Sequence, residues 1–202
     1  ALILNFNNQI DFKKIDLTDI NKVRTKILNS KYDYIFHCAT YGQPEKWEKN
    51  LNQTIILNTT LVELLLKYSI KNKSKLMYFS SCDVYGENKS SKLINENFFQ
   101  SPPNDSYRSI YSLSKILGER ICDIYKKKYN FKSHIVRPAH TFGPGQTIKD
   151  RRFISQLIKR SLTEKKAYIF GSGKSIKTWG YIAEVTSMFL NIMQHGRNQT
   201  YN

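Results

Sequence analysis

A short apolar run passes into a polar turn in Lys75-Leu76-Met77-Tyr78-Phe79-Ser80-Ser81-Cys82-Asp83-Val84-Tyr85-Gly86. The first half is aliphatic and aromatic, which is typical of a buried strand. The second half brings together two serines, an acid and a glycine. In an open α/β sheet, ligands bind beyond the carboxyl ends of the strands, where such a group would lie. The stretch therefore predicts a strand over 75–81 that ends either in a plain capping turn or in one wall of a ligand site.

Downstream of this stretch, Tyr111 and Lys115 are four positions apart in a segment with a helical pattern. Residues four apart lie on one face of a helix, so the phenol and the ammonium would reach the same side. A neighbouring cation favours the phenolate, so we expect Lys115 to lower the pKa of Tyr111 from its usual value near ~10. Such a phenol can take a proton from a sugar hydroxyl while a hydride leaves the same carbon. Alone, the pair also fits a solvated pair on a lysine-rich surface; together with the polar turn it predicts a catalytic site.

Strand and helix patterns alternate along the chain, which implies a parallel sheet covered by helices. The expected strands are 10–16, 33–39, 75–81, 133–138 and 166–170. The expected helices are 18–28, 53–70, 109–129, 151–164 and 184–195, with a loop around 42–44 and a polar loop over 87–107. The predicted fold class is α/β, a doubly wound parallel sheet of the Rossmann-like kind.

Length and composition favour a soluble enzyme. The chain has 202 residues, which is enough to bury a core in one domain with part of a second. It contains no run of about 18 apolar residues, so no membrane span is expected. Residues 1–4 lack the basic lead-in and the cleavage site of a signal peptide, and we expect a cytoplasmic protein. Cys38, Cys82 and Cys122 have no metal-ligand spacing, so we expect reduced thiols and no metal site.

The net charge is +16, from 32 basic and 16 acidic residues. A basic surface can attract nucleic acid through sequence-independent, salt-sensitive binding. It can equally draw in a substrate that carries a diphosphate. The lysines are scattered, and no stripe of arginines and aromatics interleaves with them. We therefore favour solvated faces, and a basic nucleic-acid-binding module is the least favoured alternative.

The turn Ser80-Ser81-Cys82-Asp83-Val84-Tyr85-Gly86, followed by the Tyr-x-x-x-Lys pattern at Tyr111 and Lys115, resembles the extended short-chain dehydrogenases/reductases. This group contains nucleotide-sugar epimerases, dehydratases and decarboxylases. The resemblance continues in register along almost the whole chain. The other matching segments are 14–19, 34–39, 58–60, 134–138, 142–145 and 169–182. Several segments in the right order are far more specific than any one of them.

The resemblance implies a role for each matching residue. The implied catalytic residues are Ser81, Asp83, Tyr111 and Lys115. The implied cofactor-binding residues are Asp16, Leu17, Cys38, Ala39, Thr40, Asn58, Ser80, Tyr111, Lys115 and Pro138. The implied substrate-binding residues are Ser81, His140, Lys177 and Trp179. The implied cofactor is NAD, with NADP not excluded, and the implied partners are a nucleotide-sugar substrate and a second copy of the chain packed through helices 53–70 and 109–129.

The nine glycines do not have the G-x-G-x-x-G or G-x-x-G-x-x-G spacing that cradles a pyrophosphate at a helix N-terminus. The resemblance implies that the first strand, the Gly-rich loop and the first helix of the family lie outside these 202 residues, together with part of the C-terminal domain. We therefore expect 1–145 to form an incomplete NAD-binding domain and 146–202 to begin a substrate-binding region.

The expected activity is NAD-dependent modification of a nucleotide-diphosphate sugar through a 4-keto intermediate. Tyr111 would act as base at the C4 hydroxyl. Asp83 stands where the dehydratases and decarboxylases carry Glu, although it also fits a turn residue that bonds its own backbone. Lys177 replaces an Arg that usually binds the diphosphate. The planar guanidinium, which can form two parallel hydrogen bonds, is thus replaced by the point charge of an ammonium group. The sugar and the reaction stay open, and a reductase or cofactor-sensing protein of the same fold is the alternative.

Overall fold

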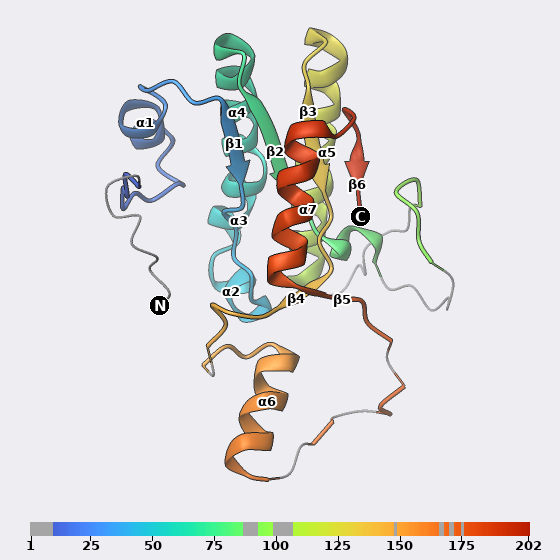
Figure 1. The fold of residues 1–202 in the computed structure, drawn as a ribbon. Coiled ribbons are helices and arrows are strands. Elements are labelled where there is room, and N and C mark those ends of the chain that lie inside the picture. Colours follow the sequence, from blue (N-terminus) through green and yellow to red (C-terminus); the bar gives the residue numbers. More distant parts are fainter. Residues whose placement is uncertain are drawn as a thin grey trace.

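The computed structural model describes residues 10–86, 93–98, 107–147, 149–165, 168–169, 172–174 and 176–202. Its centre is a four-stranded sheet in the order β1-β2-β3-β6, in which all neighbours are parallel (Figure 1). The strands are β1 (Tyr34–His37), β2 (Lys75–Phe79), β3 (Ser133–Val136) and β6 (Thr200–Tyr201). The register pairs Tyr34 with Lys75, Leu76 with Ser133, and Ile135 with Thr200.

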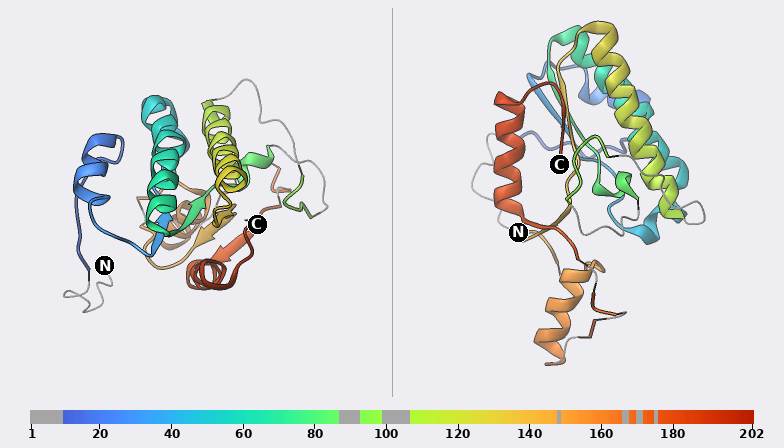
Figure 2. Two further views of the ribbon diagram at one scale, coloured as in Figure 1. Left: turned by 90° about the horizontal axis from the view of Figure 1, so that it is seen from above. Right: turned by 90° about the vertical axis from the view of Figure 1, so that its right-hand side faces the viewer.

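Helices cover both faces of this sheet. On one face lie α3 (Leu51–Asn58), α4 (Thr60–Asn72) and α5 (Tyr107–Tyr129), and α7 (Ile182–His195) lies on the other (Figure 2). The short α1 (Ile20–Lys22) and the π-helical turn η1 (Val23–Ile27) lie on the side of α4. This arrangement confirms the predicted doubly wound parallel sheet.

The core has two parts because neighbouring residues of β2 point to opposite faces of the sheet. Leu76 and Tyr78 belong to the cluster under α3, α4 and α5, whereas Met77 belongs to the cluster under α7. Every residue of β3 is buried, as expected for a strand inside a helix-covered parallel sheet. Each fully buried Leu or Ile contributes roughly 1.5–3 kcal/mol relative to an exposed one.

A second, two-stranded parallel sheet lies at the carboxyl end of the main sheet. It consists of β4 (His140–Phe142) and β5 (Trp179–Tyr181), and α6 (Phe153–Thr163) lies beyond it (Figure 1). The chain enters this sheet from β3 through residues 137–139. It leaves without a linker, because β5 ends at Tyr181 and α7 begins at Ile182.

The structure corrects two of the predicted elements and leaves a third largely undescribed. Residues 10–16 form no strand, and among the described residues none pairs with them, so the side chains of Ile10 and Phe12 are exposed. The predicted loop around 42–44 opens a helix, α2 (Pro44–Lys49), because Pro44 occupies the first helical turn, where its missing N–H costs nothing. The predicted strand 166–170 lies largely outside the described residues.

The predicted helix 53–70 is two helices. It breaks at Thr59, whose backbone angles are φ −129° and ψ −74°. At the break, α5 comes so close that a Cβ on Gly118 would lie 2.4 Å from both the Asn58 carbonyl oxygen and the Tyr78 hydroxyl. Glycine at position 118 is therefore what allows α5 to approach the sheet and the broken helix together.

Among the described residues, no helix is both long and apolar enough to cross a membrane. The same residues contain no group of three or more His, Cys, Asp or Glu side chains placed to hold a metal ion.

Candidate active site

The polar turn after β2 crosses the carboxyl end of the main sheet. The Ser80 N–H donates to the Val136 carbonyl (2.8 Å), which fixes the turn to β3. Ser81 then caps the 3₁₀ turn η2 (Cys82–Tyr85), because its hydroxyl oxygen accepts the Asp83 N–H at 3.2 Å. Ser81, rather than the Asp83 carboxylate, therefore supplies the side-chain oxygen that stabilises this turn.

Tyr111 lies against the turn from α5. Its side chain is buried, with 6% of the residue exposed, and its phenol shares a hydrogen bond with the Ser81 side chain. Burial raises the pKa of Tyr111 to about 12; the Ser81 hydrogen bond opposes this rise, and the Asp83 charge adds to it. The direction is the opposite of the one predicted from the neighbouring Lys115, because loss of water is the largest contribution.

Lys115 lies one turn further along α5 and is 1% exposed. Its ammonium donates to the Phe79 carbonyl at 2.6 Å, and it lies 5.0 Å from the ring centroid of Tyr78 and 5.8 Å from that of Tyr111. Burial lowers the pKa of Lys115 to about 7, although Glu119 on the next turn favours the charged form. Phe79 is the one hydrogen-bond acceptor of this amine within the described part of the chain, so donors remain for a ligand.

Asp83 lies close enough to Tyr111 and Cys82 for its charge to raise the pKa of both groups. The largest contribution for Cys82 is burial, which together with Asp83 raises the thiol pKa to about 11. The side chain of Asp83 is half-buried. The Asp83 carboxylate therefore acts electrostatically on the phenol of Tyr111 and on the Cys82 thiol of its own turn.

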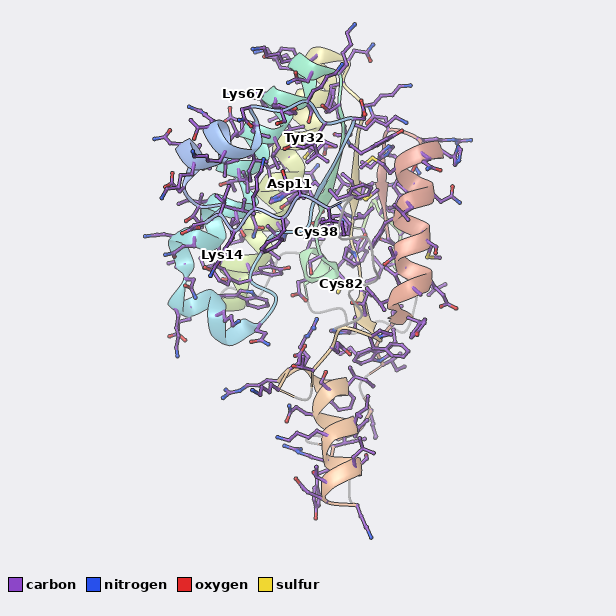
Figure 3. The ribbon with its side chains drawn as sticks, turned by 60° about the vertical axis from the view of Figure 1, so that its left-hand side comes forward. Asp11, Lys14, Tyr32, Cys38, Lys67 and Cys82 are labelled. Carbon is purple, nitrogen blue, oxygen red and sulfur yellow. The ribbon has the colours of Figure 1, made fainter. Side chains whose placement is uncertain are left out.

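The residues that follow β1 reach the same edge of the sheet. Figure 3 shows Cys38 and Cys82 toward the end of the sheet that faces α6. The hydroxyl oxygens of Thr40 and Ser80 are buried and have no partner among the described residues. The same is true of the Asn58 amide oxygen, although the Asn58 amide nitrogen donates to the Ser114 hydroxyl at 3.0 Å. These unsatisfied polar atoms are what a polar ligand at this edge could bind.

The structure also describes three further residues of the predicted cofactor site. Asp16 is exposed in the coil before α1 and accepts hydrogen bonds from the Thr18 N–H (2.9 Å) and hydroxyl (2.8 Å). Leu17 packs against the main core cluster. The Pro138 carbonyl accepts the Cys82 N–H at 3.2 Å and so joins the catalytic turn to the strand that follows β3.

The predicted substrate residues outside the main sheet come together on the small one. His140 and Trp179 are partners in the β4–β5 register, and their rings are 4.9 Å apart. Phe153 on α6 lies on the same indole at 6.2 Å. Lys177 is exposed, yet its charge reaches Cys82 in the catalytic turn, where it favours the thiolate. Of these residues, Lys177 is the one with a described electrostatic link to the turn that carries Ser81 and Asp83.

Two features of the site were not predicted. Trp47 on α2 stacks on the ring of Tyr111, and the sequence offered little signal because this lone aromatic lies between charged residues in an expected loop. Arg137 binds both carboxylate oxygens of Glu119 at 2.8 and 2.7 Å and donates to the Tyr85 hydroxyl at 2.7 Å. This buried network ties α5 to the turn η2.

Comparison with known proteins gives one family. The family described as "NAD dependent epimerase/dehydratase family" matches residues 4–202. UDP-glucuronic acid decarboxylase 1 of Xenopus tropicalis is 24% identical over 91% of this chain and 43% of its own length. The dTDP-D-glucose 4,6-dehydratase of Dictyostelium discoideum is 28% identical over 98% of this chain and 46% of its own length.

The solved structure of UDP-glucose 4-epimerase from Thermotoga maritima with UDP-glucose has a TM-score of 0.84 at 22% identity, over 99% of this chain and 64% of that one. The chain thus spans less than half the length of those two curated relatives, which carry out different reactions. Since the family match covers nearly all of its residues, the chain belongs to the NAD-dependent epimerase/dehydratase family.

Proposed function

We propose that this protein modifies a nucleotide-diphosphate sugar with NAD by way of a 4-keto intermediate. The observation that carries the proposal is the meeting of Ser81, Tyr111 and Lys115 at the carboxyl end of a parallel sheet, with the Asp83 carboxylate beside them. Parallel sheets bind their ligands at this end. The named activities of the relatives described above are all of this general class.

The residues at this edge fit NAD. The Lys115 amine has donors to spare, and the buried hydroxyls of Thr40 and Ser80 lack partners among the described residues, which suits the ribose hydroxyls and amide of the cofactor. Cys38, Ala39 and Thr40 would line it along the end of β1. Bound NAD would supply the hydride acceptor for the carbon at C4 and then the hydride donor in the return step.

The chain itself would move the proton. Ser81 would hydrogen-bond the C4 hydroxyl, and the Tyr111 oxygen would receive its proton. At neutral pH the phenol is held protonated, with a pKa of about 12, so it must be tuned when the site fills. Hydrogen-bond acceptors of a bound ligand that contact Lys115 would favour the ammonium form of its amine. That positive charge beside the Tyr111 ring would lower the pKa of the phenol. Asp83 would act in the second step, at the carbon next to the 4-keto group.

The substrate region extends to the small sheet. Trp179 and His140 offer an aromatic surface for the sugar or base, and Lys177 offers a point charge for the diphosphate. We propose that the main sheet binds the cofactor and that the small sheet with α6 binds the substrate. The predicted boundary at 145/146 differs from this division, because β4 with His140 precedes it and α7 and β6 return to the main sheet after it.

We also propose a homodimer in the cytoplasm. The exposed faces of α3 and α5 carry large apolar side chains, which a second copy of the two helices could cover: Leu51, Ile55, Leu113, Leu117 and Ile124. Cys38, Cys82 and Cys122 are free thiols, which is typical of a reducing compartment.

The test is proton NMR of a panel of UDP-, dTDP-, GDP- and CDP-sugars incubated with NAD and the native-length protein. A new anomeric signal that is lost in Tyr111→Phe and kept in Tyr129→Phe, an exposed tyrosine of the same helix, would support the proposal. Its shift and coupling would identify the reaction. An unchanged panel with cofactor shown to be bound would overturn the proposal in favour of a reductase or a cofactor-sensing protein.

A further inference from the structure

Trp47 and Tyr111 form a closely stacked pair of rings. Their centroids are 4.2 Å apart and their planes are inclined by 6°. Both residues are buried, with 4% of Trp47 and 6% of Tyr111 exposed. Such parallel contact covers one face of the phenol that we place in proton transfer, so Trp47 controls both the plane of that ring and the access of water to it.

The indole is held from its other side. Its N–H donates to the Tyr41 carbonyl, which fixes the plane of the indole relative to the end of β1. The start of α2 is held as well, because the Gln43 side chain hydrogen-bonds Asp150 near the start of α6. Trp47 is therefore held at its N–H by the loop that follows β1 and at its ring face by Tyr111 of α5.

Several polar groups face Tyr111 from the elements packed against it. Ser81, Cys82 and Asp83 approach from the catalytic turn, Tyr78 from β2, and Lys115 from the next turn of α5. The charged residues of α2 whose side chains are described are exposed, namely Lys46, Glu48 and Lys49. The contact from α2 is thus apolar, and it differs in kind from all the others.

We propose that Trp47 is a positioning residue for Tyr111: it holds the phenol ring in the plane in which its hydroxyl meets Ser81, and it keeps water away from that face of the ring. The inference rests on the proposed function insofar as Tyr111 is the group that moves the proton. A dry aromatic face disfavours the phenolate, so the stack keeps the phenol protonated until the site is filled.

The first test needs no substrate. Tyrosines are replaced by 3-fluorotyrosine in the native-length protein, and the ¹⁹F resonance of position 111 is assigned by its loss in Tyr111→Phe. Trp47→Phe keeps a ring on this face, whereas Trp47→Leu fills much of the space without one. In Trp47→Leu the resonance should lose its ring-current shift and titrate at lower pH, while Trp47→Phe stays close to the wild type.

The second test uses the sugar identified by the panel. Trp47→Leu should lower kcat roughly ten- to hundredfold with little change in KM. Trp47→Phe should retain most of the wild-type kcat. The pH profile of kcat should move to lower pH in Trp47→Leu. The resonance of the buried Tyr85 should keep its shift in every variant, which shows that the packed fold is retained.

Unchanged ¹⁹F shift and titration in Trp47→Leu would overturn the inference and leave Trp47 as a packing residue. Changed ¹⁹F behaviour with unchanged kcat and pH profile would overturn its role in positioning. If no sugar of the panel reacts, the proposed function fails, while the ¹⁹F comparison still decides whether Trp47 holds the phenol.

Discussion

The main sheet with its helices and the small sheet with α6 differ sharply in burial. In the first, all of β3 is buried, and α5 takes even Lys115 and Glu119 out of water. In the second, Ser155 is the one buried residue of α6, and Leu162 on the same helix is 75% exposed. The groups assigned to proton transfer thus lie where water is excluded and electrostatic effects are strong. The groups assigned to substrate choice lie where solvent can enter and residues can change at little cost to the fold.

The largest difference in the free energy of unfolding is expected between variants of two arginine–carboxylate pairs. Arg137 binds Glu119 with side chains 9% and 3% exposed, whereas Arg152 binds Asp150 with side chains 46% and 10% exposed. Arg137→Met leaves a buried carboxylate unpaired and should lower the free energy of unfolding by about 3–5 kcal/mol. Arg152→Met should cost about 0–1 kcal/mol. Urea unfolding of both variants checks this, and equal losses would show that the two regions are equally well packed.

The next effect is the pH dependence of stability caused by Lys115. Burial lowers its pKa from 10.5 to about 7, so between these values the unfolded chain holds a proton that the folded chain has lost. Stability therefore rises with pH across this window, by about 2–3 kcal/mol from a pH of about 7 to about 9. Lys115→Met should lack this rise.

Comparing the two proteins isolates the lysine, because the buried thiols act in both. Burial raises the pKa of Cys82 from 9.0 to about 11, and these thiols lower stability only as pH rises above the ordinary thiol range. If stability depended on pH with the same slope in the wild type and in Lys115→Met, the Lys115 ammonium would be solvated. The difference in burial between the two regions would then be smaller than described.

A smaller effect is expected at Gly118. Alanine there would place Cβ 2.4 Å from the Asn58 carbonyl oxygen and the Tyr78 hydroxyl, which are parts of the packed interior. Gly118→Ala should therefore lower the free energy of unfolding by about 1–3 kcal/mol. Gly42→Ala is the matched control, since nothing lies within 4 Å of a Cβ at that position. Thermal unfolding of the pair measures the difference, and a neutral Gly118→Ala would indicate that α5 can move away from the break.

The smallest change in stability is expected at Lys177 in the outer region. Lys177 is exposed, so Lys177→Ala should leave the unfolding temperature unchanged. Loss of one positive charge near the diphosphate should raise KM about tenfold with a smaller change in kcat. Lys174→Ala, at an exposed neighbouring lysine, serves as the control in steady-state kinetics. Equal KM values for the two variants would remove Lys177 from the substrate site.

The fold could be predicted because its strands and helices carry strong local patterns. The apolar run of β2 and the helical pair Tyr111 and Lys115 are visible without any partner. The three-residue strands β4 and β5 are too short to show periodicity and depend on each other for their hydrogen bonds. The pattern of 10–16 suggested a strand, but a strand also needs a neighbour, which local sequence does not reveal.

For the candidate site, the grouping of Ser81, Tyr111 and Lys115 could be predicted from the sequence, whereas their electrostatics could not. Sequence spacing brings Tyr111 and Lys115 to one helix face, but it carries no information on how much water each side chain loses. Burial is a property of the whole fold, and here it reverses the expected direction of the Tyr111 pKa. The stack of Trp47 on Tyr111 is invisible for the same reason, since it joins two segments 64 positions apart.

The two passages between the sheets have a mechanical consequence. Arg137 is held by Glu119 and Tyr85, and the ring of Pro138 fixes its φ near about −65°. Between β3 and β4, the backbone can therefore rotate only about ψ of Pro138 and at Ala139. Between β5 and α7, it can rotate only at the junction of Tyr181 and Ile182. Two short pivots define one line in space, so any closing of the small sheet and α6 over the catalytic turn is a rotation about that single axis.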